Sequence, residues 1–170
     1  MEGQSKLNEI IGNNLLQVGE DSAIKTISFN DFKSSFSGKF VGFYFGAHWA
    51  PPSRLFTKTL DTFYKDVNAN GKQLEVVFVT DDRESKHFES NFSKMPWLSI
   101  PYDDEHKKQI LKSRFGVAEI PTLVIVSAEE CQVITHDGRD DISKRGGAIA
   151  DWEKILAAKT EETQNQIMSN

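Results

Sequence analysis

The chain has 170 residues, of which 38% are hydrophobic and 26% are charged, and its net charge at pH 7 is −5. This length suffices for one domain with a sizeable core, and the composition is that of a globular rather than a disordered chain. The sequence has no basic block, so we expect no nucleic-acid surface, and no apolar run of about 18 residues, so we expect no transmembrane segment. The single cysteine, Cys131, excludes an internal disulfide and an all-cysteine metal site.

The first part of the sequence predicts a hairpin, a short helix and a buried strand. Strand-like stretches at 15–18 and 23–27 flank a turn cluster at 19–21. Phe29, Phe32 and Phe36 then recur at helical spacing. The apolar run 40–45 has the length and composition of a strand that is buried on both faces.

The rest of the sequence alternates helices with strands. Helices are predicted from Pro51 to about residue 67, over 84–92, over 103–114 and over 148–158, and strands over 74–79, 97–100, 123–126 and 132–135. Residues 137–140 read as a turn between the last strand and the last helix. This order predicts an α/β domain whose mixed sheet has parallel strands joined by crossover helices and an antiparallel pair at its end.

A distinctive segment, Ala-His-Trp-Ala-Pro-Pro-Ser-Arg, occupies residues 47–54, just after the first buried strand. Here the chain resembles the thioredoxin superfamily, and most closely its tryparedoxin and nucleoredoxin branch, whose members carry Trp-Cys-Pro-Pro-Cys-Arg between a strand and a long helix. The resemblance spans roughly residues 7–152 and implies a thioredoxin-like three-layer α/β sandwich, with a mixed central sheet, helices on both faces and an N-terminal β-hairpin. Further matching motifs lie at 41–45, 77–83, 96–98, 100–102, 115–117, 120–123 and 137–139.

Both cysteine positions of that motif hold other residues in this chain, Ala50 and Ser53. In the family, the first thiolate is the nucleophile, and the helix N-terminus lowers its pKa. The second cysteine resolves the mixed disulfide. A methyl group and a hydroxyl group can do neither, so the resemblance implies that the family's thiol–disulfide oxidoreductase activity is lost here and that the chain as written is not an enzyme.

Two explanations of the replaced cysteines remain open. The chain is either a natural redox-inactive member that keeps the scaffold for protein binding or a structural role, or an engineered Cys-to-Ala/Ser variant of an active oxidoreductase. The unequal pair of replacements favours the first explanation. The intact neighbours Trp49, Pro51, Pro52 and Arg54 fit the second.

The resemblance also implies a peptide groove beside the degenerate motif. Ile120 and Pro121 match the family's loop that faces the motif, which implies a cis peptide bond before Pro121. In the family this loop offers backbone groups to an extended polypeptide segment, a strand-addition mode that needs no cysteine. The candidate groove residues are Trp49, Pro51, Pro52, Arg54, Ile120 and Pro121.

The remaining expectations concern organisation and partners. We expect residues 1–158 to form a single domain and residues 159–170 a polar tail or helix extension. We expect a protein partner or larger assembly and no small-molecule cofactor, and no metal because no histidine pair lies at metal-ligand spacing with the cysteine. The N-terminus lacks the pattern of a secretory signal, so the cytoplasm is the default location, and a mitochondrial or ciliary complex stays open.

Overall fold

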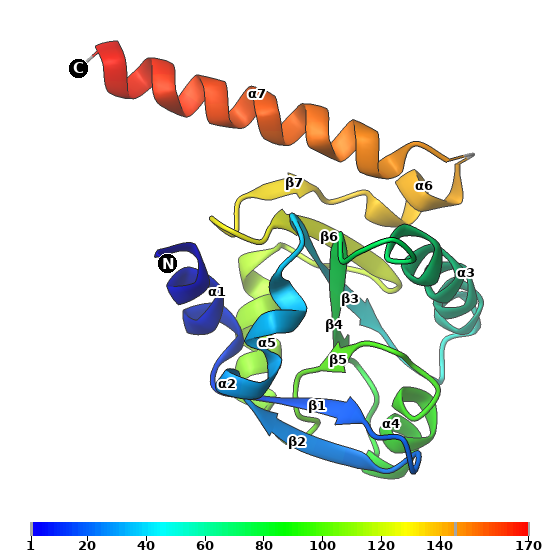
Figure 1. The fold of residues 1–170 in the computed structure, drawn as a ribbon. Helices are drawn as coiled ribbons and strands as arrows, with labels where there is room; N and C mark the ends of the chain where they lie inside the picture. Colours follow the sequence, from blue (N-terminus) through cyan, green and yellow to red (C-terminus); the bar gives the residue numbers. More distant parts are fainter. Residues whose placement is uncertain (1, 145, 170) are drawn as a thin grey trace.

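The computed structural model describes residues 2–144 and 146–169 of the chain. Its centre is a seven-stranded sheet with the strand order β2-β1-β5-β4-β3-β6-β7, drawn in Figure 1. The elements, in chain order, are α1 (Glu2–Ile11), β1 (Asn14–Val18), β2 (Ile24–Ser28), α2 (Phe29–Phe32), the 3-10 helix η1 (Lys33–Phe36), β3 (Phe40–Gly46), α3 (Pro51–Val67), β4 (Leu74–Thr80), α4 (Ser85–Phe92), β5 (Leu98–Ser99), α5 (Glu105–Arg114), β6 (Thr122–Ser127), β7 (Val133–Thr135), α6 (Gly138–Ser143) and α7 (Ala148–Ser169).

The sheet is mixed, as the sequence predicts. β3 and β4 are parallel and pair over their whole length, from Phe40 opposite Leu74 to Gly46 opposite Thr80, with α3 as the crossover between them. β6 is antiparallel to β3, β7 is antiparallel to β6, and β1 and β2 form the predicted antiparallel hairpin. All residues of β3 and β4 are buried, which is the pattern of parallel strands covered on both faces.

Helices cover the sheet on both faces, so the predicted three-layer sandwich is confirmed. One core cluster joins α1, α2, η1 and α5 to alternate strand residues such as Val41, Phe43 and Val77. The other joins α3, α4, α6 and the start of α7 to the opposite set, such as Phe40, Tyr44 and Val76. Because side chains along a strand point alternately to the two faces, each central strand contributes to both cores.

Two elements differ from the sequence-based expectation. The first is α1, which was not expected and which buries Leu7, Ile10 and Ile11 against the sheet. The second is α6, where a turn was expected over 137–140. Its first residue is Gly138, and a Cβ there would lie 2.8 Å from the Leu123 carbonyl oxygen, so only glycine allows this close approach to β6.

The last helix, α7, continues beyond residue 158 to Ser169, so it runs into the segment for which a polar tail or a helix extension was expected. Its final residues, 161–169, are exposed, and in Figure 1 this part of the helix extends away from α6 and past β7. A polar composition predicts a frayed end, but it does not by itself terminate a helix that contains neither glycine nor proline. The division of the chain at residue 158 stays a prediction. None of the helices in the described part of the chain is long and apolar enough to span a membrane.

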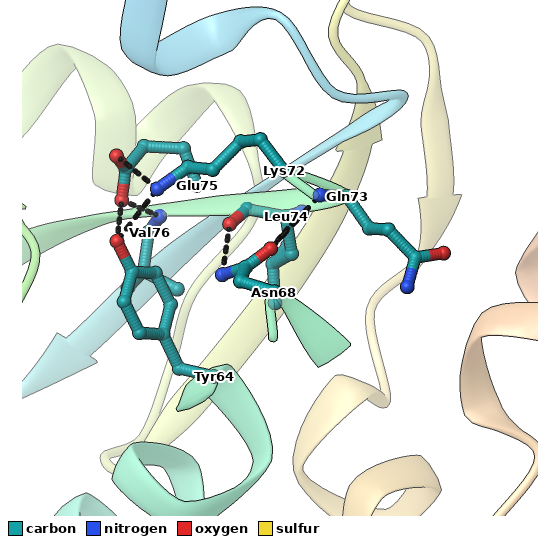
Figure 2. Close-up of polar contacts among 7 residues, drawn as sticks. All are labelled: Tyr64, Asn68, Lys72, Gln73, Leu74, Glu75 and Val76. Atoms are coloured by element: carbon teal, nitrogen blue, oxygen red, sulfur yellow. Dashed lines mark hydrogen bonds and ion pairs between the residues drawn. The ribbon is translucent and has the colours of Figure 1, made fainter. Parts of the chain in front are cut away.

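A buried polar cluster fixes the end of α3 to the start of β4, as Figure 2 shows. The Tyr64 hydroxyl donates to Glu75 Oε1 at 3.0 Å, and Lys72 Nζ lies 2.9 Å from Glu75 Oε2. Lys72 Nζ also donates to the Tyr64 hydroxyl at 2.7 Å, and the Val76 N–H donates to Glu75 Oε1. Burial raises the pKa of the Glu75 carboxyl, and the Lys72 ammonium offsets part of that rise.

Asn68 closes the turn next to this cluster. Its side-chain Oδ1 accepts hydrogen bonds from the backbone N–H groups of Gln73 and Leu74, and its Nδ2 donates to the Leu74 carbonyl. These contacts satisfy backbone N–H and C=O groups at the start of β4. They hold the connection from α3 in a defined position relative to the strand.

The Lys72→Met variant should lower the free energy of unfolding by about 3 kcal/mol, because it leaves the buried Glu75 carboxyl group without its ammonium partner. Lys65→Met is the matched control: it removes an exposed pair with Asp61 and should cost at most about 0.5 kcal/mol. Urea denaturation at pH 7 measures both. Equal losses in the two variants would contradict the role assigned to the buried pair.

A second prediction concerns pH. The folded state raises the pKa of Glu75 above its ordinary value of about 4.3. Between the ordinary and the raised pKa, the folded protein therefore holds a proton that the unfolded chain has released, so the contribution of Glu75 to stability falls as the pH rises over this interval and is constant above it. Glu75→Gln should remove this slope. Urea denaturation between about pH 4 and pH 8 should show the variant gaining stability relative to the wild type as the pH rises, and parallel curves would refute the assignment.

Candidate functional site

The candidate site lies where β3 and β4 end. Gly46 is the last residue of β3, Thr80 is the last residue of β4, and the two residues pair directly. In open α/β sheets, ligands bind at the carboxyl ends of the parallel strands. Gly46 cannot be replaced without disturbance, because a Cβ there would lie 2.8 Å from the Tyr44 hydroxyl oxygen.

Ala50 and Ser53 stand at the start of α3, both buried. Ala50 is the N-cap residue, and its carbonyl accepts hydrogen bonds from the N–H groups of Ser53 and Arg54. Pro51 suits the first helical position because its missing N–H would have no partner there. The Ser53 side chain is only 1% exposed, and its hydroxyl has no hydrogen-bond partner among the described residues. The helix start therefore presents a methyl group and an unsatisfied hydroxyl, and no thiol.

Tyr44 holds this first turn of α3 against the central strand. Its hydroxyl donates to the Ser53 carbonyl at 2.9 Å and lies 2.7 Å from Thr57 Oγ1. Burial raises the pKa of Tyr44 to about 12, so the phenol keeps its proton at neutral pH and remains a donor.

Trp49 is held in place although 49% of its surface is exposed. Its Nε1 donates to the Asp81 carbonyl at 3.2 Å, and the Arg83 guanidinium lies 5.5 Å from the centre of the ring. Both contacts come from the residues that follow β4. The exposed indole is therefore fixed in orientation by the neighbouring strand end.

Asp82 organises the loop that carries Trp49. It is 5% exposed, and its two carboxylate oxygens accept from the His48 N–H at 2.7 Å and from the Thr80 hydroxyl at 2.8 Å. Arg54 Nη1 donates to the His48 carbonyl at 2.6 Å. The sequence reading did not assign Asp82 or Arg83 to the site, although charged residues directly after a buried strand were a usable signal.

The peptide bond between Ile120 and Pro121 is cis, as the resemblance implies. Thr122, the next residue, pairs with Phe45, so this loop lies at the same end of the sheet as Gly46. Ile120 lines a cavity of about 370 Å³ together with Asp81 and Arg83, which are the two residues that contact Trp49. The contact of Pro121 with residues 49–51 stays a prediction.

The other candidates lie at the start of α3. Pro51, Pro52 and Arg54 are exposed on its first turn. Pro51 and Arg54 line a second hollow of about 640 Å³ with His48 and the exposed Leu55. Ile120 and the pair Pro51 and Arg54 therefore line two different hollows, and the residues that line neither are Trp49, Pro52 and Pro121.

Cys131 does not belong to this site. It follows β6, whose last residue, Ser127, pairs with Phe40 at the beginning of β3, so it lies at the opposite end of the sheet, about 20 Å away along seven residues of strand. Burial raises the pKa of this thiol to about 11, which makes it unreactive at neutral pH. Within residues 2–144 and 146–169, no group of three or more His, Cys, Asp or Glu side chains is placed to hold a metal ion.

Comparison with known proteins agrees with this geometry. Residues 38–133 match a family described as thioredoxin-like. Nucleoredoxin of Mus musculus is 40% identical over 109 residues, which are 64% of this chain and 25% of that protein. This chain thus spans about a quarter of the length of such curated relatives.

Solved structures of tryparedoxins match most of the chain. Tryparedoxin I from Crithidia fasciculata is 37% identical with a TM-score of 0.68, and the match covers 81% of this chain and 90% of that one. Tryparedoxin from Trypanosoma brucei is 33% identical with the same TM-score of 0.68, over 83% and 90% of the two chains. On the family match, the sheet topology and these relatives, the chain belongs to the thioredoxin-like family, and its similarity lies with the nucleoredoxins and tryparedoxins.

Proposed function

We propose that this chain is a redox-inactive member of that branch, in which Ala50 and Ser53 stand at the positions of the reactive cysteines, and that it binds an extended segment of a protein partner. The observation that carries the proposal is Trp49, a half-exposed indole held by the Asp81 carbonyl and the Arg83 guanidinium. Tryptophan is enriched among residues that dominate interface energies. An indole that is already ordered loses little further freedom on binding.

Redox inactivity follows from the chemistry of the residues at the helix start. Thiol–disulfide exchange needs a thiolate that attacks a disulfide sulfur and a second thiol that releases the product. Neither the Ala50 methyl nor the Ser53 hydroxyl can form a disulfide. Cys131 cannot substitute for them, because it is buried and lies at the other end of the sheet.

The binding segment is proposed to lie along the loop at Pro121, next to Trp49. Main-chain hydrogen bonds from such a loop recognise a strand without regard to its sequence, and adjacent pockets supply specificity. We propose that two hollows serve as these pockets: one is lined by Asp81 and Arg83, which contact Trp49, and the other by His48 and Pro51. We assign this site to a domain of residues 1–158, with residues 159–170 as an extension of it.

A second candidate is an engineered or recently changed oxidoreductase, and the Ser53 hydroxyl favours it. That group is fully buried and has no hydrogen-bond partner among the described residues, an arrangement that costs about 1–3 kcal/mol. A cysteine thiol is a weaker donor and tolerates such an apolar setting. The surroundings of residue 53 therefore suit a thiol better than the hydroxyl that occupies them.

Trp49→Ala should weaken the complex with the protein partner by about 2 kcal/mol or more. The partner is first isolated with the immobilised chain from its source organism and identified by mass spectrometry, and its affinity for both forms is then measured by calorimetry. The control is Ile167→Ala, which removes another exposed apolar side chain, at the end of α7. A complex that is insensitive to Trp49→Ala but weakened by Ile167→Ala would place the interface on α7. Failure to isolate any partner would favour the second candidate.

The double variant Ala50→Cys with Ser53→Cys should form a disulfide and reduce insulin in the presence of dithiothreitol, whereas the unchanged chain should match the blank. Positions three apart at a helix start lie on one face, within disulfide reach, and the helix N-terminus lowers the pKa of the first thiol.

The control for this experiment is Ala50→Cys alone, which has no resolving thiol, with Cys131→Ser included in every form. A double variant that stays reduced under oxidising glutathione would show that the site no longer has dithiol geometry. Turnover by the unchanged chain above the blank would refute its redox inactivity.

A further inference from the structure

We infer that Arg83 selects an acidic side chain in the bound segment, so that the partner offers an extended stretch with an aspartate or glutamate next to the residue that packs on Trp49. This inference rests on the proposed function and adds to it the chemical class of the partner. Its basis is the cavity between the strand ends and α5, to which the proposed binding mode assigns no ligand chemistry.

The cavity opens where a segment on the Pro121 loop would pass. Ile120, the residue before that proline, forms part of its wall. The cavity is formed by the ends of β3 and β4, by the residues that follow β4 and by α5. Its charged and aromatic lining residues include Asp82, Arg83, Tyr102, Glu105, Lys108 and Lys112.

Most charges of this wall are already matched within the protein. Lys108 Nζ lies 2.7 Å from Glu105 Oε1 and 4.5 Å from the centre of the Tyr102 ring, and its side chain is only 7% exposed. Lys112 Nζ lies 3.6 Å from Asp81 Oδ1. Because each of these ammonium groups lies beside a carboxylate, Lys108 and Lys112 add no net positive charge that would attract an acidic ligand.

The carboxylate of Asp82 is held by neutral donors, the His48 N–H and the Thr80 hydroxyl. Both of its oxygens are thus occupied, and the side chain is buried. The Asp82 carboxylate therefore fixes the loop that carries Trp49. Because it is buried, it is not available to recognise a basic ligand.

Arg83 and Asp82 are thus the two charged groups of this wall without an ion-pair partner among the described residues, and of the two only Arg83 is exposed. Among those residues, no carboxylate lies within ion-pair distance of Arg83. Its contact is the face of the Trp49 ring, with the guanidinium carbon 5.5 Å from the ring centre. A guanidinium on an aromatic ring is oriented by the ring yet keeps the N–H groups on its edge for other acceptors.

This pairing presents two complementary groups side by side. The indole offers apolar area, and the guanidinium offers a planar set of donors that fits a carboxylate with two parallel hydrogen bonds. A segment that packs an apolar residue on Trp49 would bring a nearby acidic residue to Arg83, whereas a basic residue there would meet like charge. An acidic segment is therefore the occupant that charge complementarity favours.

The test uses a random decapeptide library, displayed with fixed flanks so that no free carboxyl terminus is present, and selected on the whole chain. Peptides selected on the wild type should carry Asp or Glu at one position. Selection on Arg83→Gln should lose that preference, and selection on Arg83→Glu should replace it with Lys or Arg. The matched control is Lys86→Glu, an equally abrupt charge reversal on the exposed first turn of α4, outside the cavity wall, which should leave the preference unchanged.

Affinity then measures the size of the effect with one selected peptide and its amide counterpart, in which the acidic residue becomes Gln or Asn. Against the wild type, the amide peptide should bind about tenfold more weakly, because a hydrogen bond to a charged group is lost. Against Arg83→Gln, the two peptides should bind equally. Arg83→Lys should recover only part of the discrimination, since an ammonium lacks the planar fork. Thermal unfolding of each variant checks that the exposed substitution leaves the fold intact.

The outcomes separate the two proposals. Two results would overturn the role of Arg83 and leave the binding groove standing. One is a set of peptides that require Trp49 but carry no acidic position. The other is an acidic position that persists in peptides selected on Arg83→Gln. A wild-type chain that selects no peptide dependent on Trp49 would overturn the groove itself, and the role of Arg83 with it. An acidic preference that disappears in Arg83→Gln and survives in Lys86→Glu would establish the inference.

Discussion

The parallel pairing of β3 and β4 is the constraint on which the rest of this molecule depends. Because the two strands run in the same direction and in full register, the residues that follow each of them emerge at one end of the sheet. Residues 47–50 and 81–83 are far apart in sequence, yet they form one surface. The Trp49 indole, the Asp81 carbonyl and the Asp82 carboxylate meet there through hydrogen bonds that neither segment could make alone. Burial of both strands on both faces makes this arrangement rigid.

The frame of this surface is built from backbone. The Tyr44 hydroxyl, the N-cap geometry of Ala50 and the cis bond before Pro121 all position backbone. None of them depends on a sulfur atom. The methyl of Ala50 and the hydroxyl of Ser53 fit into this frame, although the hydroxyl is buried without a hydrogen-bond partner among the described residues. Under the proposed function, recognition at this site rests on the exposed side chains of Trp49 and Arg83.

The opposite end of the sheet carries a different electrostatic arrangement. Glu75 is buried with Lys72 and Tyr64, and burial raises its pKa even though the ammonium is close. Desolvation is thus the larger effect, and the pair serves to place the α3–β4 connection more than to add stability. At the site end, by contrast, Arg83 is left exposed and stacked on an aromatic ring, where it keeps its donors available.

Local patterns in the sequence determined much of this protein. The apolar runs at β3 and β4, the proline pair at the start of α3 and the antiparallel pair near residue 130 identified the sheet and its class, because burial on both faces leaves an unbroken apolar run. The sequence also determined which atoms are present at residues 50 and 53, and therefore which reaction is impossible there. Tertiary structure alone decided that α1 packs on the sheet, that α6 forms where a turn was expected, and that Asp82 and Arg83 hold the Trp49 loop. Those outcomes depend on contacts between segments more than 30 residues apart, such as the hydrogen bond between His48 and Asp82, and no local periodicity encodes them.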